Sequence, residues 1–301
     1  MTITRRGVLA SSAAFALAAG GTNAAAQPFF RSHRLPIGLQ LYSVGAELRR
    51  DLVGTLKAVA EIGYKTVETA GYAGQSPRAL RAAFDQFGLA CTSAHVPTRG
   101  NGPEPTLSGD LARLAADMHV LGARQVVAPS FLVPEGRSLR SELTLDDWRA
   151  TAAFLNRTGA ALKRDGLELG YHNHNPEFAP LAGGTALDLL LKETDPTLVH
   201  FEMDAGWVVA GGHDPAALLE AHRGRFTQMH VKDVAKGVEP NYAFHVRTTS
   251  VGEGVIDWPR LLRAAYAEGV REFFVEHEPP FEKPVLEMLA VSYRNLAAMP
   301  A

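Results

Sequence analysis

The chain has 301 residues, with 30 Lys and Arg against 32 Asp and Glu, and its formal net charge is −2 when histidine is neutral. Hydrophobic residues make up 46% of the chain and charged residues 21%, values typical of a globular protein that exclude a disordered or fibrous one. The charge lacks the basic excess of nucleic-acid-binding proteins, and a single cysteine, Cys91, excludes an internal disulfide and a cysteine-based metal site.

Residues 1–26 have the layout of an export signal. The paired Arg5 and Arg6 precede an apolar, alanine-rich stretch without an acidic residue, which ends at Ala26. The arginine pair resembles the twin-arginine signal of bacteria, which exports folded proteins. We therefore expect cleavage near Ala26, a mature domain spanning 27–301 and a periplasmic location. The apolar stretch is shorter than the ~20 residues that cross a bilayer, so we expect no membrane association of the mature chain.

Eight short runs of β-type residues follow, separated by segments with helical periodicity. The expected strands are 37–42, 66–70, 90–95, 125–128, 167–173, 198–204, 226–232 and 272–276. The expected helices include 47–62, 77–87, 144–164, 215–222, 258–266 and 285–296. This alternation predicts a single (β/α)8 barrel, for which roughly 250 residues is an ordinary length. An open, doubly wound sheet is the alternative, but residues 43–46 after the first strand lack its glycine-rich phosphate loop.

The last four strands end in ionisable residues. Successive side chains of a strand point to opposite faces, and the active site of such a barrel lies at the carboxyl ends of its strands. Along each of these strands, every second residue is apolar. The other parity carries His172 and His174, Glu202 and Asp204, His230 and Lys232, and Glu276 and Glu278. We therefore expect four neighbouring strands to direct these side chains into one mouth.

Ionisable groups that share a confined mouth repel or desolvate one another, and a divalent cation is the simplest way to neutralise them. Imidazole nitrogen and carboxylate oxygen together suit Mn, Zn, Fe or Co. We predict one divalent metal ion bound by Asp204, His230 and Glu276, with His172 as the fourth ligand. Structural roles are the alternative, since Asp204 could cap a turn and Glu276 could form an ion pair with Arg271.

These strand ends resemble the sugar phosphate isomerase/epimerase family of xylose isomerase-like barrels. The matching segments are 37–42, 67–68, 170–174, 202–204, 229–233, 252–259 and 275–278. The resemblance implies one divalent metal at Asp204, His230 and Glu276 and a carbohydrate as the small-molecule partner. In keto-sugar epimerases of this family the fifth-strand ligand is a glutamate that also moves protons. Here His172 occupies that position, which departs from the two-glutamate mechanism.

A histidine that binds metal cannot also serve as a free base, so other groups must transfer the proton. His174, two residues further along the same strand, is our first candidate, and Glu177 and Glu278 are the alternatives. Lys232 is placed to stabilise an enediolate, although it also suits a structural pair with Asp233.

Four further residues are candidate substrate contacts. Glu68 and His95 end the second and third strands and suit sugar hydroxyls, while Tyr42 and Trp207 suit an apolar wall or simple packing at the mouth. The glycines of 252–254 favour a turn before a helix over a phosphate loop. Because no cluster of Lys and Arg at the strand ends offers a phosphate clamp, we expect a non-phosphorylated sugar or keto-sugar.

The sequence therefore favours an isomerase or epimerase that removes a proton next to a carbonyl of such a sugar. A lyase or dehydratase acting on 3-keto-glycosides shares the first step and is the alternative reaction. A non-catalytic carbohydrate-binding barrel is the alternative from another class of protein. We expect no nucleic-acid partner, and the sequence leaves a homo-oligomer open.

Overall fold

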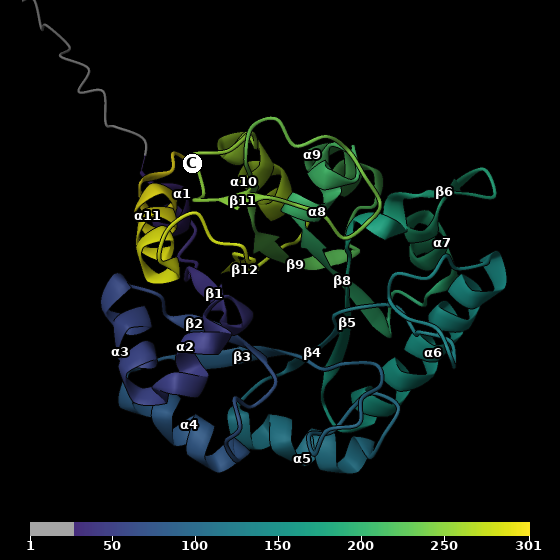
Figure 1. Cartoon of the computed structure of the whole chain (residues 1–301), viewed down its shortest axis with the longest axis horizontal. Coiled ribbons are helices and arrows are strands. Elements are labelled where there is room, and N and C mark those ends of the chain that lie inside the picture. The colour runs from purple at the N-terminus through teal and green to yellow at the C-terminus, as the bar shows by residue number, and fades with distance from the viewer. Residues whose placement is uncertain (1–26) are drawn as a thin grey trace, which may run out of the picture.

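The structure is a computed structural model that describes residues 27–301, and within them eight parallel strands close into a barrel (Figure 1). Around the barrel they follow the order β1-β12-β9-β8-β5-β4-β3-β2. In chain order they are β1 (Gly38–Gln40), β2 (Thr66–Ala70), β3 (Ala90–His95), β4 (Gln125–Ala128), β5 (Glu168–His172), β8 (Val199–Asp204), β9 (Phe226–Val231) and β12 (Glu272–Val275). The predicted (β/α)8 barrel is confirmed. The predicted export signal lies outside the described residues.

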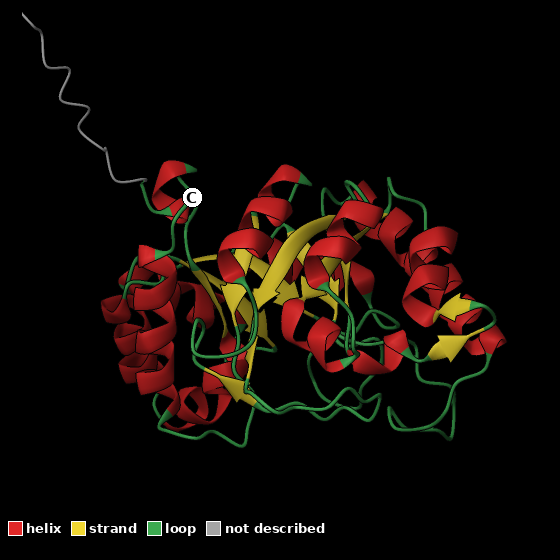
Figure 2. Ribbon diagram, turned by 90° about the horizontal axis from the view of Figure 1, so that it is seen from above, coloured by secondary structure: helices red, strands yellow, loops and turns green. Residues whose placement is uncertain are grey.

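Helices surround the strands, and Figure 2 shows them on both sides of the barrel when it is viewed from above. The larger ones are α2 (Gly45–Arg50), α3 (Leu52–Ile62), α4 (Pro77–Gln86), α5 (Leu111–Leu121), α6 (Leu145–Arg164), α7 (Ala186–Glu193), α8 (Ala205–Ala210), α9 (Pro215–Ala221), α10 (Trp258–Ala267) and α11 (Val285–Ala298). Short elements complete the chain: α1 (Phe29–Ser32), η1 (Leu41–Val44), η2 (Asn175–Phe178), and the strand pairs β6 (Pro180–Leu181) with β7 (Gly184–Thr185) and β10 (Asp233–Val234) with β11 (Thr248–Thr249). None of the helices in residues 27–301 combines the length and apolar character that a membrane span requires.

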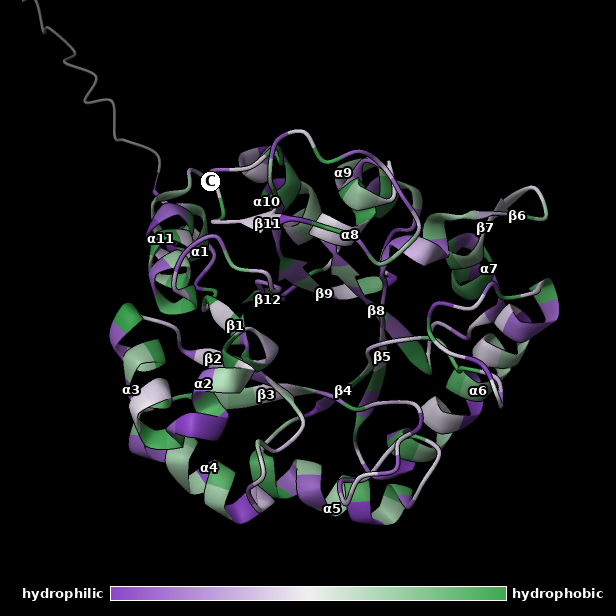
Figure 3. Ribbon diagram, in the orientation of Figure 1, coloured by the Kyte–Doolittle hydropathy of each residue, from purple (hydrophilic) through white to green (hydrophobic). Residues whose placement is uncertain are grey.

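The outer helices are amphipathic, and Figure 3 shows hydrophilic and hydrophobic residues along the same helices. In α6 the buried residues Trp148, Leu155 and Leu162 recur every seventh position, so one stripe faces the barrel. This helix begins with a capping box, in which Thr144 and Asp147 satisfy each other's backbone N–H groups. The sequence pattern thus forms the helix and orients it on the sheet.

The predicted helix 47–62 is wrong in one respect, because the chain forms two helices there instead of one. Asp51 has an extended backbone between α2 and α3, and its carboxylate accepts a hydrogen bond from the Gly54 N–H at 2.9 Å. Aspartate is among the strongest N-cap residues, so it starts a new helix despite the continuous apolar stripe. The predicted strands 66–70, 90–95 and 125–128 have the observed bounds.

The interior of the barrel is polar, whereas aliphatic layers fill most barrels of this kind. At the amino ends of the strands, Gln125 donates to Glu168 at 2.6 Å and Gln228 donates to Glu272 at 3.1 Å. We call these four residues the floor. Higher in the barrel, Glu68 accepts hydrogen bonds from other buried side chains. The polar interior continues from there to the carboxyl ends, where the candidate site lies.

Asp233 holds the long segment between β9 and α10. Its buried carboxylate accepts hydrogen bonds from the N–H groups of Gly252 at 2.9 Å and Gly254 at 3.2 Å, and from Trp258 Nε1 at 2.8 Å. A Cβ at Gly254 would lie 2.1 Å from Asp233 Oδ1, so this approach requires glycine. The predicted turn at 252–254 is therefore confirmed, and the segment above it is anchored beside the mouth.

Candidate active site

The four predicted metal ligands converge at the carboxyl ends of β5, β8, β9 and β12. His172, Asp204, His230 and Glu276 are buried, and each offers one ligand atom within 4.8 Å of the others. His230 Nδ1 lies 3.0 Å from Glu276 Oε2 and 3.7 Å from Asp204 Oδ2. His172 Nε2 lies 3.8 Å from the same Asp204 oxygen. The inward parity inferred from the sequence thus brings all four side chains together.

This donor set fits a divalent cation. Ligand atoms held about 2.0–2.2 Å from a common ion lie roughly 3 to 3.5 Å from one another, and the separations from His230 Nδ1 to the two carboxylates are 3.0 and 3.7 Å. Two imidazole nitrogens and two carboxylate oxygens suit Mn, Zn, Fe or Co. A small movement of the side chains therefore suffices to place all four atoms around one ion.

The other nitrogens of the two ligand histidines face a second set of carboxylates. His172 Nδ1 lies 3.0 Å from Glu202 Oε2, while His230 Nε2 lies 2.7 Å from Glu68 and 3.1 Å from Glu202. His95 Nε2 also contacts Glu202, at 2.8 Å. Such carboxylates fix the tautomer and orientation of a metal-binding imidazole. Glu202 was not among the predicted site residues, although its inward parity two positions before Asp204 was the signal for it.

Lys232 is fully buried among the carboxylates of the mouth. Its Nζ lies 2.7 Å from Asp204 and 2.7 Å from Glu276, and it donates to Glu278. Burial lowers the pKa of Lys232, but Asp204 and Glu276 outweigh it and hold that pKa well above its usual value. The ammonium also lies 5.0 Å from the centre of the Trp207 ring. The alternative pairing of this lysine with its sequence neighbour at 233 is therefore wrong.

His174 and Glu278 lie at the mouth beside the metal-ligand cluster. The His174 ring is 4.8 Å from the His172 ring, and no group in the described residues bonds its Nδ1. Burial and the neighbouring His172 and Lys232 lower the pKa of His174 well below its usual value, so its imidazole is neutral. Glu278 accepts a hydrogen bond from Trp207 Nε1 at 3.1 Å. Both side chains are placed to exchange a proton with a ligand in the mouth.

Two predicted site residues do not reach the mouth. Glu177 is fully buried and accepts a hydrogen bond from the Tyr171 hydroxyl at 2.6 Å, on the parity of β5 that faces the helices. Glu68 is 0% exposed, and its oxygens are taken by Gln40, Ser93 and His230. Glu177 therefore lies on the wrong side of its strand for proton transfer, and Glu68 lies too deep to bind a sugar hydroxyl.

The other predicted substrate contacts differ in how exposed they are. Tyr42 is 53% exposed at the rim, and the side chain of His95 is 10% exposed and borders the mouth. Trp207 is only 2% exposed and its ring lies 5.0 Å from the Lys232 ammonium, which fits the alternative of simple packing at the mouth better than a wall. Asp204 also caps α8, because its Oδ1 accepts from the Trp207 N–H at 2.8 Å while Oδ2 faces the cluster. Arg271 bonds backbone carbonyls instead of Glu276.

The cluster opens into a cleft of about 790 Å³. Residues that border it include Tyr42, His95, His172, His174, Glu276 and Glu278, together with Arg99, Leu139 and Phe244 from the surrounding loops. A cleft of this volume is within the ordinary range for small-molecule sites. It lies at the carboxyl ends of the barrel strands, where such folds place their active sites.

The barrel and its mouth define the chain as an α/β barrel protein with a buried His and carboxylate site. Residues 56–294 match the family described as the xylose isomerase-like TIM barrel, and the chain belongs to that family. The resemblance predicted from the strand ends is thereby confirmed.

Curated relatives include the inosose dehydratase of Geobacillus kaustophilus, 27% identical over 202 residues, or 61% of this chain and 62% of the relative. The chain thus aligns with less than two thirds of that relative's length. The inosose dehydratase of Lacticaseibacillus casei is 24% identical over 252 residues, or 73% of this chain and 82% of the relative.

Solved structures give the same picture of the fold. A sugar phosphate isomerase/epimerase from Parabacteroides distasonis aligns with a TM-score of 0.71 and 27% identity, over 86% of this chain and 96% of that chain. An L-ribulose 3-epimerase shares the fold, with a TM-score of 0.60 and 14% identity over 86% of this chain and 92% of that chain.

Proposed function

We propose that the protein is a metal-dependent enzyme that removes a proton next to a carbonyl of a non-phosphorylated sugar or keto-sugar. The observation that carries the proposal is the convergence of His172, Asp204, His230 and Glu276 beside a cleft that accommodates a sugar. A divalent ion at these four residues supplies Lewis acidity, which polarises a carbonyl oxygen and acidifies the adjacent C–H.

Three side chains at the mouth supply proton transfer and charge stabilisation. His174 lines the cleft, is neutral, and has a nitrogen without a hydrogen-bond partner in the described residues, so it is the base that takes the proton. Glu278 follows β12 and is oriented by Trp207 and Lys232, so it returns or delivers a proton. The buried ammonium of Lys232 lowers the electrostatic cost of the negative charge that develops on the substrate.

We propose elimination of a β-substituent as the step that follows proton removal. The curated relatives named inosose dehydratase support this outcome, since a dehydratase removes water by elimination. One base and one acid suffice for it, and His174 and Glu278 supply them. Isomerisation or epimerisation is the second candidate, supported by the Parabacteroides sugar phosphate isomerase/epimerase that matches 86% of this chain.

Hydrogen exchange tests the proposal directly. The purified protein, loaded with Mn²⁺, is incubated in D2O with a panel of keto-sugars and 3-keto-glycosides, and proton NMR follows deuterium at the α-carbon. We expect exchange together with loss of the β-substituent. Tight binding of a sugar without exchange over hours would instead identify a non-catalytic carbohydrate-binding barrel. His174→Asn and Glu278→Gln, with metal content measured in parallel, separate the loss of a proton-transfer group from the loss of the ion.

We also propose that the chain acts in the periplasm, on the strength of the export signal read in residues 1–26. The test replaces Arg5 and Arg6 by lysine in the full chain and measures its distribution between periplasmic and cytoplasmic fractions. We expect the substitution to retain the protein in the cytoplasm. An unchanged distribution contradicts a twin-arginine route.

A further inference from the structure

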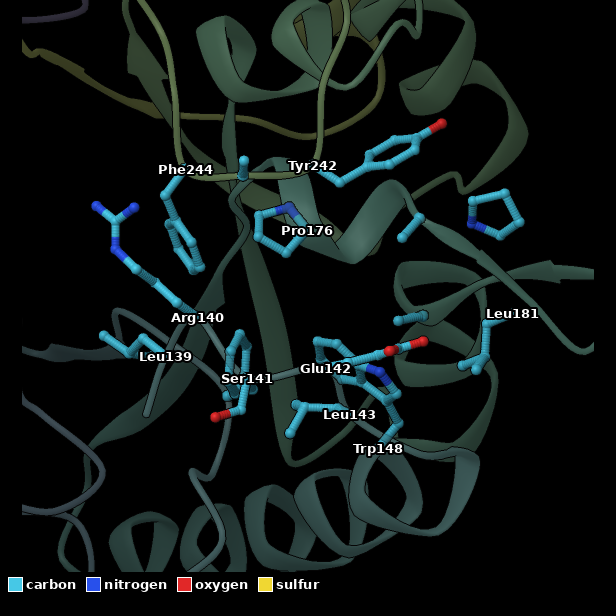
Figure 4. Close-up of a pocket in the computed structure, with 15 residues that line it drawn as sticks. Leu139, Arg140, Ser141, Glu142, Leu143, Trp148, Pro176, Leu181, Tyr242 and Phe244 are labelled. Carbon is cyan, nitrogen blue, oxygen red and sulfur yellow. The ribbon is translucent and has the colours of Figure 1, made fainter. Parts of the chain in front are cut away.

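A second pocket adjoins the cleft (Figure 4), and we call it the side pocket; Arg140, Ser141 and Glu142 line it together with apolar residues. It has a volume of about 390 Å³. Its apolar lining includes Phe131, Leu143, Trp148, Pro176, Leu181 and Tyr242. Leu139 and Phe244 line both the side pocket and the cleft, so the two spaces share a wall.

Phe244 is the main part of that wall. Its ring centre lies 5.2 Å from that of His174 on the cleft side and 6.4 Å from that of Phe131 on the side-pocket side. Figure 4 shows Phe244 and Tyr242 on one side of the pocket, facing Leu143 and Trp148 on the other. A group attached to a ligand at His174 therefore meets an aromatic surface as it leaves the cleft.

The wall is held in a conformation that a bulky residue rarely adopts. Phe244 has a backbone φ of 52°, in the left-handed region, which persists only where the surroundings fix it. The fully buried Asn175 fixes it, because its Oδ1 accepts from the Phe244 N–H at 3.1 Å and its Nδ2 donates to the Asn241 carbonyl at 2.8 Å. Asn175 follows His174 directly, so one short segment positions both the proposed base and the wall.

We infer that the side pocket binds an apolar, ring-sized substituent of the sugar, so that the substrate is a glycoside with an aromatic aglycone. This inference rests on the proposed function, which places the sugar in the cleft. The volume of about 390 Å³ is near the lower end of the roughly 300–1,000 Å³ range of small-molecule pockets, which suits one or two rings. Phe244 and Tyr242 on one side and Trp148 on the other offer a planar ring aromatic faces to pack against.

Binding of two matched probes tests the inference. Phenyl 3-keto-β-D-glucopyranoside and its methyl counterpart are titrated into the Mn²⁺-loaded protein by calorimetry. We expect the phenyl compound to bind at least tenfold more tightly, because its ring enters the side pocket. Equal affinities for the two probes overturn the inference.

Variants that fill or open the side pocket test whether the phenyl preference arises there. Ala179 is half-buried and lines the side pocket but not the cleft, so Ala179→Trp should reduce the phenyl preference to less than threefold while methyl-glycoside affinity stays unchanged. Ala82→Trp, at an exposed position of α4, is the matched control and should keep the full preference. Tyr242→Ala removes an aromatic wall at a 45% exposed position and should weaken the preference severalfold. An undiminished preference in both pocket variants overturns the inference.

This test and the hydrogen-exchange test fail independently. A phenyl preference that Ala179→Trp abolishes supports the side pocket even when no probe exchanges its proton, and then only the proposed chemistry fails. Hydrogen exchange that is equally fast for phenyl and methyl compounds, with equal affinities, leaves the proposed chemistry standing and overturns the aglycone site.

Discussion

The two ends of the barrel interior use similar residues in different ways. At the floor, the amides of Gln125 and Gln228 each donate to one carboxyl group, on Glu168 and Glu272. At the mouth, imidazoles and one ammonium face several carboxylates at once, within 4.8 Å in the case of the four candidate ligands. Each of these floor carboxyl groups accepts from one glutamine amide, whereas each charge at the mouth faces several groups of opposite charge. A collectively balanced cluster of this kind is suited to binding an ion.

The two candidate ligand carboxylates at the mouth and Glu272 at the floor have opposite pKa shifts. Burial raises the pKa of Asp204 and Glu276, but Lys232 outweighs it and holds both pKa values below their usual range. At the floor, burial raises the pKa of Glu272 to about 7, and the carboxylates of Glu68 and Glu202 add to the rise. The two candidate ligand carboxylates are therefore charged, whereas burial favours the protonated acid at Glu272 and also raises the pKa of Glu278 at the mouth.

The largest expected effect comes from Asp204→Asn. The amide keeps the oxygen that caps α8 but loses the charge that faces the candidate ion. We expect bound metal to fall to near zero and proton exchange to fall by more than ~100-fold, since even indirect partners of a metal site cost up to that much. Elemental analysis and exchange rates measure both. If the variant keeps both its bound metal and its exchange rate, the mouth is not the metal site.

Glu202→Gln should have the next largest effect. Glu202 contacts His95, His172 and His230, so its charge orients the imidazoles of two candidate ligands. We expect metal affinity to fall by about 10–100-fold while the protein stays folded. Calorimetric metal titration measures the affinity, and circular dichroism checks the fold. An unchanged affinity would show that Glu202 serves the structure alone, as the floor residues do.

The sequence predicted the barrel because eight β-type runs alternate with amphipathic segments, and alternation along each strand gave the direction of each side chain. The four candidate ligands were found in this way, because all of them lie near strand ends at one parity. However, the direction of a side chain does not tell how far along the barrel axis it lies. Glu68 has the inward parity but lies below the mouth, where Gln40 and Ser93 occupy its oxygens.

Parity still holds for His174 and Glu278 just beyond their strands, but it no longer predicts direction further along the chain. Glu177 lies in η2, where the turn redirects it to Tyr171 on the helix side. Phe244 lies in the long segment after β9, and its place at the mouth depends on Asn175, which is 69 residues away in sequence. No local pattern encodes such a contact. For the same reason, the break at Asp51 depends on a side-chain cap that competes with a continuous apolar stripe.

Glu272→Gln tests the floor through stability and pH. The folded pKa of about 7 lies above the usual value of 4.5, so the folded state binds the proton more tightly than the unfolded state. The stabilisation is therefore fully present below the unfolded pKa and is lost as pH rises towards the folded pKa. We expect the variant to be more stable than the parent at pH 8 by up to about 3 kcal/mol, and nearly equal to it near pH 4.

Urea denaturation of both proteins at the two pH values measures this difference. Metal content serves as the control, because the floor is not part of the candidate site and its substitution should leave bound metal unchanged. A gap of the same size at both pH values would mean that the substitution acts through packing, and the contrast in protonation between floor and mouth would then fail.

Glu168→Gln should have the smallest effect on stability. It tests whether the hydrogen bond to a glutamine amide, and not burial, determines how a carboxyl group behaves at the floor. Glu168 is half-buried and accepts from Gln125 Nε2 at 2.6 Å, and a glutamine keeps an acceptor oxygen at the same place. We expect stability to change by less than about 0.5 kcal/mol at pH 8. The same urea titrations measure it. A loss well above that figure would show that one acceptor oxygen facing Gln125 is not sufficient here, and that the floor depends on the second oxygen or the charge of the carboxylate.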